Sequence, residues 1–261
     1  MIRTKSILLL LVCSLIIFTS ANIFILSGVY KWEDAKVVKK SYGTVREIIK
    51  SQTSTLEMLE LKIIELMPGK GLANYDVEPG VDEMIIIKDG KAELYIKNKP
   101  VVLTKGSVVV MPQGEKVRIK NGSKKWLVFY NFRFKTGNKP TKKYSPFISI
   151  WDTVQYKPSA NGGRRNIINK ETSALKNLEI HVTTLKEGLP SHASHTHADE
   201  EIILIRKGLA EESINGISYP APDGSAVFLT NVDRHGIRNA GKGECEYYAI
   251  RWITEKTDQR K

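Results

Sequence analysis

The chain carries the same sequence pattern twice in succession. Residues 31–69 align without a gap with residues 150–188 at a constant offset of 119, and after one deleted residue the match continues at an offset of 118. The corresponding pairs include Arg46 and Arg165, Leu56 and Leu175, Glu83 and Glu201, Gly90 and Gly208, and Asn121 and Asn239. A tandem repeat in a chain of 261 residues predicts two similar domains of ordinary size.

Both copies have the local signature of β structure. Short runs rich in β-branched residues are bounded by Gly, Pro or Asn, at residues 84–87, 101–103, 108–111, 202–205 and 226–229. Evenly spaced short strands of this kind predict an all-β fold made of two double-sheet jelly-roll barrels. The polar segment 135–143 contains Gly and Pro and predicts the linker. We therefore expect an N-terminal barrel at residues 29–140 and a C-terminal barrel at residues 141–261.

The second copy contains four potential metal ligands. His195 and His197 are separated by one residue and Glu201 lies four residues further on, so their side chains share one face of an extended segment. His235 follows a turn-like segment, residues 231–233, and a returning antiparallel strand would bring its imidazole beside the other two. Three imidazoles and one carboxylate suit Fe, Mn, Ni, Cu or Zn better than Ca or Mg.

The spacing of these residues resembles the two motifs of the cupin superfamily. The first motif, with its His-x-His, Glu and flanking glycines, is matched by Gly188, His195, His197, Glu201 and Gly208, with one extra residue after the first Gly. The second is matched by Gly224, His235 and Asn239, with Thr230 at the family's Pro position and Val232 at its second Gly. The resemblance implies a bicupin, two tandem double-stranded β-helix barrels. Its cofactor would be a divalent transition metal, Mn or Fe ahead of Ni or Zn.

The first copy differs from the second at the ligand positions. His195, His197 and His235 correspond to Val77, Pro79 and Val117, so only the glutamate is kept, as Glu83. The first copy retains the turn residues Pro112 and Gly114 and the motif residue Asn121. Because turn residues preserve a fold and ligands preserve a function, we expect a metal-free N-terminal barrel and a metal-binding C-terminal barrel.

Several residues around the ligands are candidates for contacts with a substrate. Strand parity places Asp199 on the ligand face, unless a bulge turns it to water. His181 lies on a preceding strand and would orient a ligand, act as acid or base, or be structural. Arg238 and Arg251 would hold a substrate carboxylate, or face solvent as ordinary basic residues. His192 has the opposite parity and is expected in a loop.

The N-terminal 28 residues predict an export signal or a membrane anchor. Arg3 and Lys5 precede an apolar run at residues 7–18, and the small residues 19–21 suit a signal peptidase. Because apolar residues resume at 23–26, an uncleaved anchor of about 20 residues is the alternative. We therefore expect an exported protein of the periplasm or cell envelope, with any membrane contact made only through this segment.

The expected partners follow from charge and patterning. The net charge is +12, but the lysines are scattered and no nucleic-acid-binding motif accompanies them, so we expect no nucleic-acid partner. A small anionic molecule is the expected ligand. Exposed sheet edges favour a homodimer.

Three classes of function are compatible with these features. The first is a metal-dependent enzyme, namely a dioxygenase, decarboxylase, isomerase, lyase or hydrolase, and the second is a non-catalytic module that binds a sugar acid. The third is a structural role, against which the full ligand set of the second copy argues. An open metal site in an apolar cavity favours the enzyme. The architecture is also similar to the ureidoglycine aminohydrolase group of bicupins, manganese enzymes with a different ligand set, Glu-x-His-x-x-x-His and a distant Gln.

Overall fold

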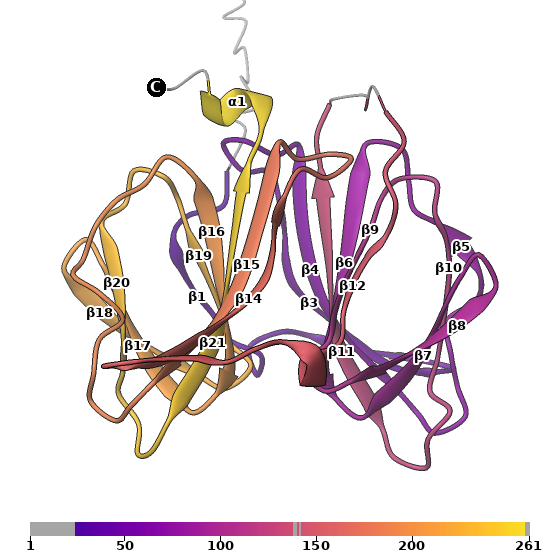
Figure 1. The fold of residues 1–261 in the computed structure, drawn as a ribbon, viewed down its shortest axis with the longest axis horizontal. Helices are drawn as coiled ribbons and strands as arrows, with labels where there is room; N and C mark the ends of the chain where they lie inside the picture. The colour runs from indigo at the N-terminus through magenta and orange to yellow at the C-terminus, as the bar shows by residue number, and fades with distance from the viewer. Residues whose placement is uncertain (1–23, 138–139, 141, 259–261) are drawn as a thin grey trace, which may run out of the picture.

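The structure is a computed structural model that describes residues 24–137, 140 and 142–258. Each half of the chain forms one large and one small antiparallel sheet, and the two halves lie side by side (Figure 1). Apart from one 3₁₀ turn, η1 (Trp151–Thr153), and one short helix, α1 (Glu255–Asp258), the regular structure of the described residues is entirely β. The predicted all-β fold of two jelly-roll barrels is therefore confirmed.

The first half of the chain supplies most of one large sheet and the whole of one small sheet. The order in the large sheet is β12 (Phe147–Ser149), β9 (Val108–Met111), β6 (Val81–Asp89), β11 (Leu127–Lys135), β4 (Met58–Leu66), β3 (Gly43–Ser51) and β2 (Val37–Lys40). The order in the small sheet is β5 (Tyr75–Asp76), β10 (Lys116–Lys120), β7 (Lys91–Ile96) and β8 (Lys99–Thr104).

The second half repeats this topology, except that its small sheet has no counterpart of β5 among the described residues. The order in its large sheet is β1 (Gly28–Tyr30), β19 (Ala226–Leu229), β16 (Glu200–Lys207), β21 (Cys245–Ile253), β15 (Asn177–Leu185), β14 (Gly162–Lys170) and β13 (Lys157–Ser159). The order in its small sheet is β18 (Ile217–Pro222), β17 (Leu209–Ile214) and β20 (His235–Asn239). The offset found in the sequence thus relates corresponding strands of the two barrels.

The two halves exchange their edge strands. β1, which precedes the first barrel in the chain, pairs with β19 of the second, and Figure 1 shows this indigo strand among orange ones. In the same way β12, which precedes the second barrel, pairs with β9 of the first. Each large sheet therefore contains one strand from the other half, and the sheets do not divide at the expected boundary of 140/141.

The predicted leader, residues 1–28, lies largely outside the described residues. Its last five residues are described and belong to the fold, since Phe24 forms a bridge with Gln52 and Gly28 opens β1. Within the described part of the chain, no helix has the length and apolar character required to cross a bilayer.

Three hydrophobic cores account for the long apolar runs. One core fills each barrel, between its large and small sheets, and the third lies between the two large sheets. β6 and β16 are buried on both faces because one face points into a barrel and the other into this third core. Their sequences therefore read as continuous hydrophobic runs instead of alternating ones.

Two buried carboxylates join the barrels reciprocally. Glu200 of β16 accepts hydrogen bonds from the first barrel, including one from Thr53 Oγ1 at 2.6 Å. Asp82 of β6 accepts them from the second barrel, including one from the backbone N of Ala174 at 2.8 Å. The remaining donors are Ser54 and Thr55 to Glu200, and Thr172 and Ser173 to Asp82. Because these donors satisfy the buried oxygens, the contacts fix how the two barrels pack.

A tryptophan from each half packs on a glycine of the other. Trp151 covers Gly106, where an added Cβ would lie only 2.6 Å from a ring carbon. The guanidinium carbons of Arg165 and Arg206 lie 4.7 and 4.0 Å from the Trp151 ring. The corresponding residues of the other half are Trp32, Gly224, Arg46 and Lys88.

Candidate metal centre

Three histidines meet at one end of the second barrel. His195 precedes β16 and His235 opens β20, and the backbone N of each donates to the backbone O of the other at 2.9 Å. This two-way pairing places the rings of His195, His197 and His235 with one candidate ligand atom each, all within 4.8 Å of one another. The predicted convergence of the three imidazoles is therefore confirmed.

Backbone carbonyls fix the orientation of two of these rings. His197 Nδ1 lies 2.9 Å from the backbone O of Asp199, and His235 Nδ1 lies 2.9 Å from the backbone O of Asp233. A carbonyl only accepts, so each Nδ1 must carry a proton and donate it. In the neutral ring the lone pair is then on Nε2, which is the nitrogen that faces the centre of the cluster.

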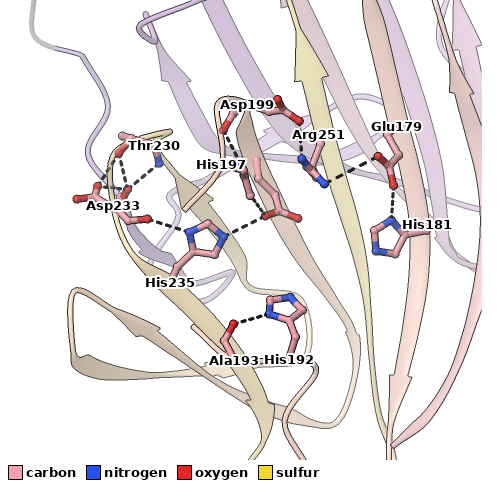
Figure 2. A network of polar contacts seen from close by, with 12 residues as sticks. Glu179, His181, His192, Ala193, His197, Asp199, Thr230, Asp233, His235 and Arg251 are labelled. Carbon is pink, nitrogen blue, oxygen red and sulfur yellow. Dashed lines mark hydrogen bonds and ion pairs between the residues drawn. The ribbon is translucent and has the colours of Figure 1, made fainter. Parts of the chain in front are cut away.

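The carboxylate of Glu201 lies against these two imidazoles. Its Oε2 is 3.1 Å from His197 Nε2 and 3.5 Å from His235 Nε2. Figure 2 shows the rings of His197 and His235 turned toward the same region. Lone pairs of two neutral imidazoles thus face a carboxylate, an arrangement that needs either additional protons or a cation to be favourable.

Two unpaired nitrogens of the cluster also require a proton or a cation. His195 Nδ1 and His235 Nε2 are buried without a hydrogen-bond partner. Buried polar atoms in proteins are almost always paired, and imidazole nitrogen is a good ligand for transition metals. The donor set therefore fits a divalent transition metal, and the identity of that metal is not fixed by the donors.

The cluster is electrostatically organised around one negative charge. Burial alone would raise the pKa of Glu201, but the adjacent imidazoles of His197 and His235 lower it to about 2. Burial lowers the pKa of His235, but the contact with Glu201 outweighs it and the net shift is upward. Burial and the neighbouring histidines lower the pKa of His195, which favours the neutral, ligating form.

The cluster opens into a cavity of about 420 Å³ inside the second barrel. Its walls combine apolar residues of the barrel core, such as Ile203 and Ile237, with a few polar groups. The arginines of the lining are Arg164 and Arg251, which lie on the large sheet. This combination is typical of sites for small polar ligands.

Three of the predicted neighbours, His181, Asp199 and Arg251, lie near the cluster within one polar chain. Arg251 Nη2 donates to Asp199 Oδ2 at 2.6 Å, and Arg251 Nη1 lies 3.9 Å from Glu179 Oε2. His181 Nδ1 lies 3.3 Å from the other oxygen of Glu179, as Figure 2 shows. His181 and Arg251 line the cavity, whereas the carboxylate of Asp199 is held by Arg251. Burial, followed by the charge of Arg164, lowers the pKa of His181 to about 4.

The other two basic candidates have contrasting positions. Arg238 is exposed on the outer face of β20, where its Nε donates to Glu211 Oε1 at 2.8 Å, so the structure does not bring it to the cluster. His192 lies in a loop, as expected, but its ring packs edge-on against His195 with centroids 4.3 Å apart. It therefore lies at the cavity wall, a position that strand parity did not predict.

Sequence reasoning missed a glutamate in the cavity. Glu212 of β17 is fully buried, lines the cavity, and has neither carboxyl oxygen hydrogen bonded. Burial, with the charge of Glu201 adding to it, raises the pKa of Glu212 to about 8. The available signal was the internal repeat, since the position corresponds to Leu94 in the first copy.

A segment near the N-terminus supports the loop that carries His235. Ser27 Oγ donates to Asp233 Oδ2 at 2.6 Å and accepts from the backbone N of Thr230 at 2.8 Å. Thr230 Oγ1 also donates to Asp233 Oδ2 at 2.6 Å. Because the backbone O of Asp233 orients His235, Ser27 is linked to the candidate ligand through a single residue.

The first barrel satisfies its retained glutamate without a cation. Asn131 Nδ2 donates to Glu83 Oε1 at 2.8 Å, and Tyr75 Oη donates to the same oxygen. In the described part of the chain, His195, His197 and His235 are the only set of three or more such side chains grouped closely enough to hold a metal.

Comparison with known proteins agrees with this geometry. A family model described as the cupin domain matches residues 181–251. No curated protein matches the chain significantly.

Solved structures resemble the chain over most of its length. A putative glyoxylate-induced protein from Pseudomonas aeruginosa has a TM-score of 0.73 and 13% identity, over 90% of this chain and 92% of that one. An oxalate decarboxylase from Lactobacillus farciminis, in a formate complex, has a TM-score of 0.67 and 12% identity, over 89% and 88%.

A Bacillus subtilis oxalate decarboxylase, described with Mn(II) centers, has a TM-score of 0.66 and 12% identity, over 90% of this chain and 79% of that one. Identities this low carry the fold and leave the activity open. Residues 181–251 therefore match the cupin domain, and the chain shares its overall two-barrel fold with these solved structures.

Proposed function

We propose that the second barrel binds a divalent transition metal and acts as a metal-dependent enzyme on a small anionic molecule. The observation that carries this proposal is the set of three converging imidazoles, two of which direct a lone pair at the carboxylate of Glu201. Glu201 would complete the ligand set as the fourth side chain. A bound divalent metal would supply Lewis acidity and orient a chelating ligand.

The charges around the cavity favour an anion. Arg164 and Arg251 line it, and a divalent metal would add two positive charges beside the single negative charge of Glu201. Arg251 is partly occupied by Asp199 and Glu179, and the first barrel has the corresponding contact between Arg133 and Glu60. Because the first barrel keeps this pair, we assign the contact of Arg251 with Glu179 to structure. Arg164 is paired as well, since its Nη2 donates to Glu179 Oε1 at 2.8 Å and its Nε to Asn166 Oδ1 at 2.7 Å, so an anion would compete with these contacts.

The charges around the cavity indicate the class of ligand but do not select one reaction. Small carboxylates are a reasonable first panel, because two of the similar structures are oxalate decarboxylases. The alternative function is a non-catalytic module that captures a sugar acid. The polar groups at the cavity wall, His181 and Arg251, favour the enzyme, because they could position a reacting molecule beside the metal.

The metal content of the purified protein tests the first step. Elemental mass spectrometry after reconstitution with Mn, Fe, Ni or Zn should give about one metal per chain, lost in His195→Ala and His235→Ala. The matched control is His192→Ala, which removes a ring beside the cluster and should retain the metal. A chain that stays metal-free with every ion offered would contradict the proposal.

Turnover tests the second step. The metal-loaded protein is incubated with a panel of small carboxylates and sugar acids, under air and without oxygen. Consumption that requires air would indicate an oxygenase, and consumption in both conditions would indicate a decarboxylase, lyase, isomerase or hydrolase. Binding without consumption would favour the non-catalytic alternative.

We further propose that the protein is exported, on the basis of the N-terminal sequence. Ser27 sets a limit on processing, because the segment from Phe24 onward is part of the fold. Cleavage after the small residues at 19–21 would leave this segment intact. Fractionation of expressing cells, with N-terminal sequencing of the product, checks the location and the cleavage site.

A further inference from the structure

The inner face of β17 carries one polar residue among apolar ones. Ala210, Glu212 and Ile214 alternate inward along this strand, and all three are buried. Ala210 and Ile214 belong to the hydrophobic core of the second barrel. Glu212 therefore interrupts an otherwise apolar face and places a carboxyl group at the cavity wall.

The first barrel shows what this position requires for folding alone. The corresponding strand, β7, has Ala92, Leu94 and Ile96 on its inner face, all of them buried. The two barrels thus share Ala and Ile at the flanking positions and differ only at the central one. Leucine suffices where the metal ligands are absent, and glutamate occurs where they are present.

The carboxyl group of Glu212 is not explained by a contact within the protein. Both of its oxygens are buried and neither makes a hydrogen bond of ordinary geometry, although the backbone N–H of Gly236 favours the charged form. Leaving a buried polar group unpaired costs about 1–3 kcal/mol. The same lack of a partner suggests that something in the cavity supplies one.

We propose that Glu212 contacts the ligand of the metal site and forms a hydrogen bond with a carboxylate oxygen of that ligand. This inference rests on the proposed function, because the ligand would be held between the His cluster and β17. Burial raises the pKa of Glu212, which agrees with a protonated carboxyl able to donate to an anion. A ligand with a carboxylate group would thus contact the metal and accept a hydrogen bond from Glu212 at the same time.

Two variants of Glu212 separate this role from a structural one. Glu212→Leu reproduces the residue of the first barrel, and Glu212→Gln keeps a hydrogen-bond donor of similar shape. Glu211→Gln is the matched control, because Glu211 is the neighbour on the outer face of the same strand and contacts Arg238. Metal content is measured for every protein before any binding experiment.

The first readout is thermal stability without a ligand. Because Glu212 has no partner and leucine fits the equivalent position of β7, Glu212→Leu should raise the melting temperature. A melting temperature lowered by several degrees would show that the carboxyl group stabilises the fold, and would overturn the proposal.

The second readout is the binding of oxalate, used as a probe carboxylate, to the Co(II)-loaded protein, followed through the visible spectrum of the metal. Loss of a hydrogen bond to a charged group should raise the Kd about 10- to 100-fold in Glu212→Leu. Glu212→Gln should stay within about threefold of the wild type, and Glu211→Gln should match it.

The outcomes separate a failure of the proposed metal site from a failure of the role of Glu212. A protein that takes up no metal would contradict the proposed function itself. A metal-loaded wild type that does not bind oxalate, or a Glu212→Leu variant that binds it with unchanged Kd, would overturn the role of Glu212 alone.

Discussion

The backbones of His195 and His235 hydrogen bond to each other in both directions, at 2.9 Å each way. The two residues lie in different segments of the metal-binding half, one before β16 and the other at the start of β20. The pairing acts as a short strand contact outside the regular sheets. Because this pairing involves only backbone atoms, the backbone itself holds the two imidazoles close together.

The hydroxyl of Ser27 should affect metal affinity although it lies outside the cluster. Ser27→Ala removes the donor to Asp233, whose backbone O orients His235, so the ring loses part of its support. Groups that orient a ligand typically contribute 10- to 100-fold to affinity, and we expect about a tenfold higher metal Kd. Competition with a chromophoric chelator measures it.

Ser27→Thr is the matched variant for this prediction, since it keeps a hydroxyl group at the same position. It should restore most of the affinity, whereas an equal loss in both variants would indicate that packing and not the hydrogen bond is responsible. An unchanged Kd in Ser27→Ala would show that the loop holds His235 without help.

The stability of the metal-free protein should fall below pH 6.5 because of His181. Its pKa is about 4 in the folded protein and 6.5 as the ordinary value, so the unfolded chain binds the proton more readily. The stabilisation is complete above pH 6.5 and is lost as the pH falls toward 4, by on the order of 3 kcal/mol. Urea unfolding at several pH values measures the change.

His181→Asn is the comparison, because asparagine does not titrate in this range. The free energy of unfolding of the variant should therefore depend less steeply on pH between 6.5 and 4 than that of the wild type. Parallel pH profiles for the two proteins would contradict the assignment.

Asp82 should be a strong determinant of how the two barrels hold together. Asp82→Ala removes the acceptor for Thr172, Ser173 and the backbone N of Ala174, which leaves buried donors unpaired. We expect a loss of about 3 kcal/mol or more in the free energy of unfolding, measured in urea. Metal content should stay near the wild-type value, because Asp82 belongs to the other barrel.

Glu171→Ala is the control for this prediction. Its carboxylate contacts Lys142 and Tyr144 on the exposed surface, so its removal should have little effect on stability. Similar losses in both variants would argue against a special role of the buried carboxylate between the barrels.

Gly106 should tolerate alanine poorly for two separate reasons. Its φ is +94°, which disfavours any residue with a Cβ, and the added Cβ would lie 2.6 Å from the Trp151 ring. The backbone term costs about 1–2 kcal/mol and the displacement of Trp151 about 1–3 kcal/mol more. Thermal unfolding of Gly106→Ala measures the sum.

Gly114→Ala isolates the backbone term. Gly114 has a φ of +73°, but no atom lies within 4 Å of its added Cβ. Gly114→Ala should therefore lose only the backbone term, about 1–2 kcal/mol of the free energy of unfolding. Equal losses at the two glycines would show that Trp151 moves aside freely.

The repeat, the strands and the three histidines could be predicted from the sequence because each depends on local spacing. The offset between the copies predicts two barrels, and alternation along a strand places His195 and His197 on one face. The cupin-like second motif brings in His235. Parity also placed His192 away from the cluster, and this failed because a loop does not keep the alternation of a strand.

Other features were decided by tertiary structure alone. The exchange of β1 and β12, the contact of Ser27 with Asp233, and the pairing of Arg238 with Glu211 on the outer face join residues from distant parts of the chain. Such contacts follow from how whole sheets pack, which local spacing does not encode. The sequence by itself thus determined the barrels and the imidazoles. The packing of one barrel on the other decided what supports His235, and the closing of the second barrel decided that Glu212 faces the same cavity.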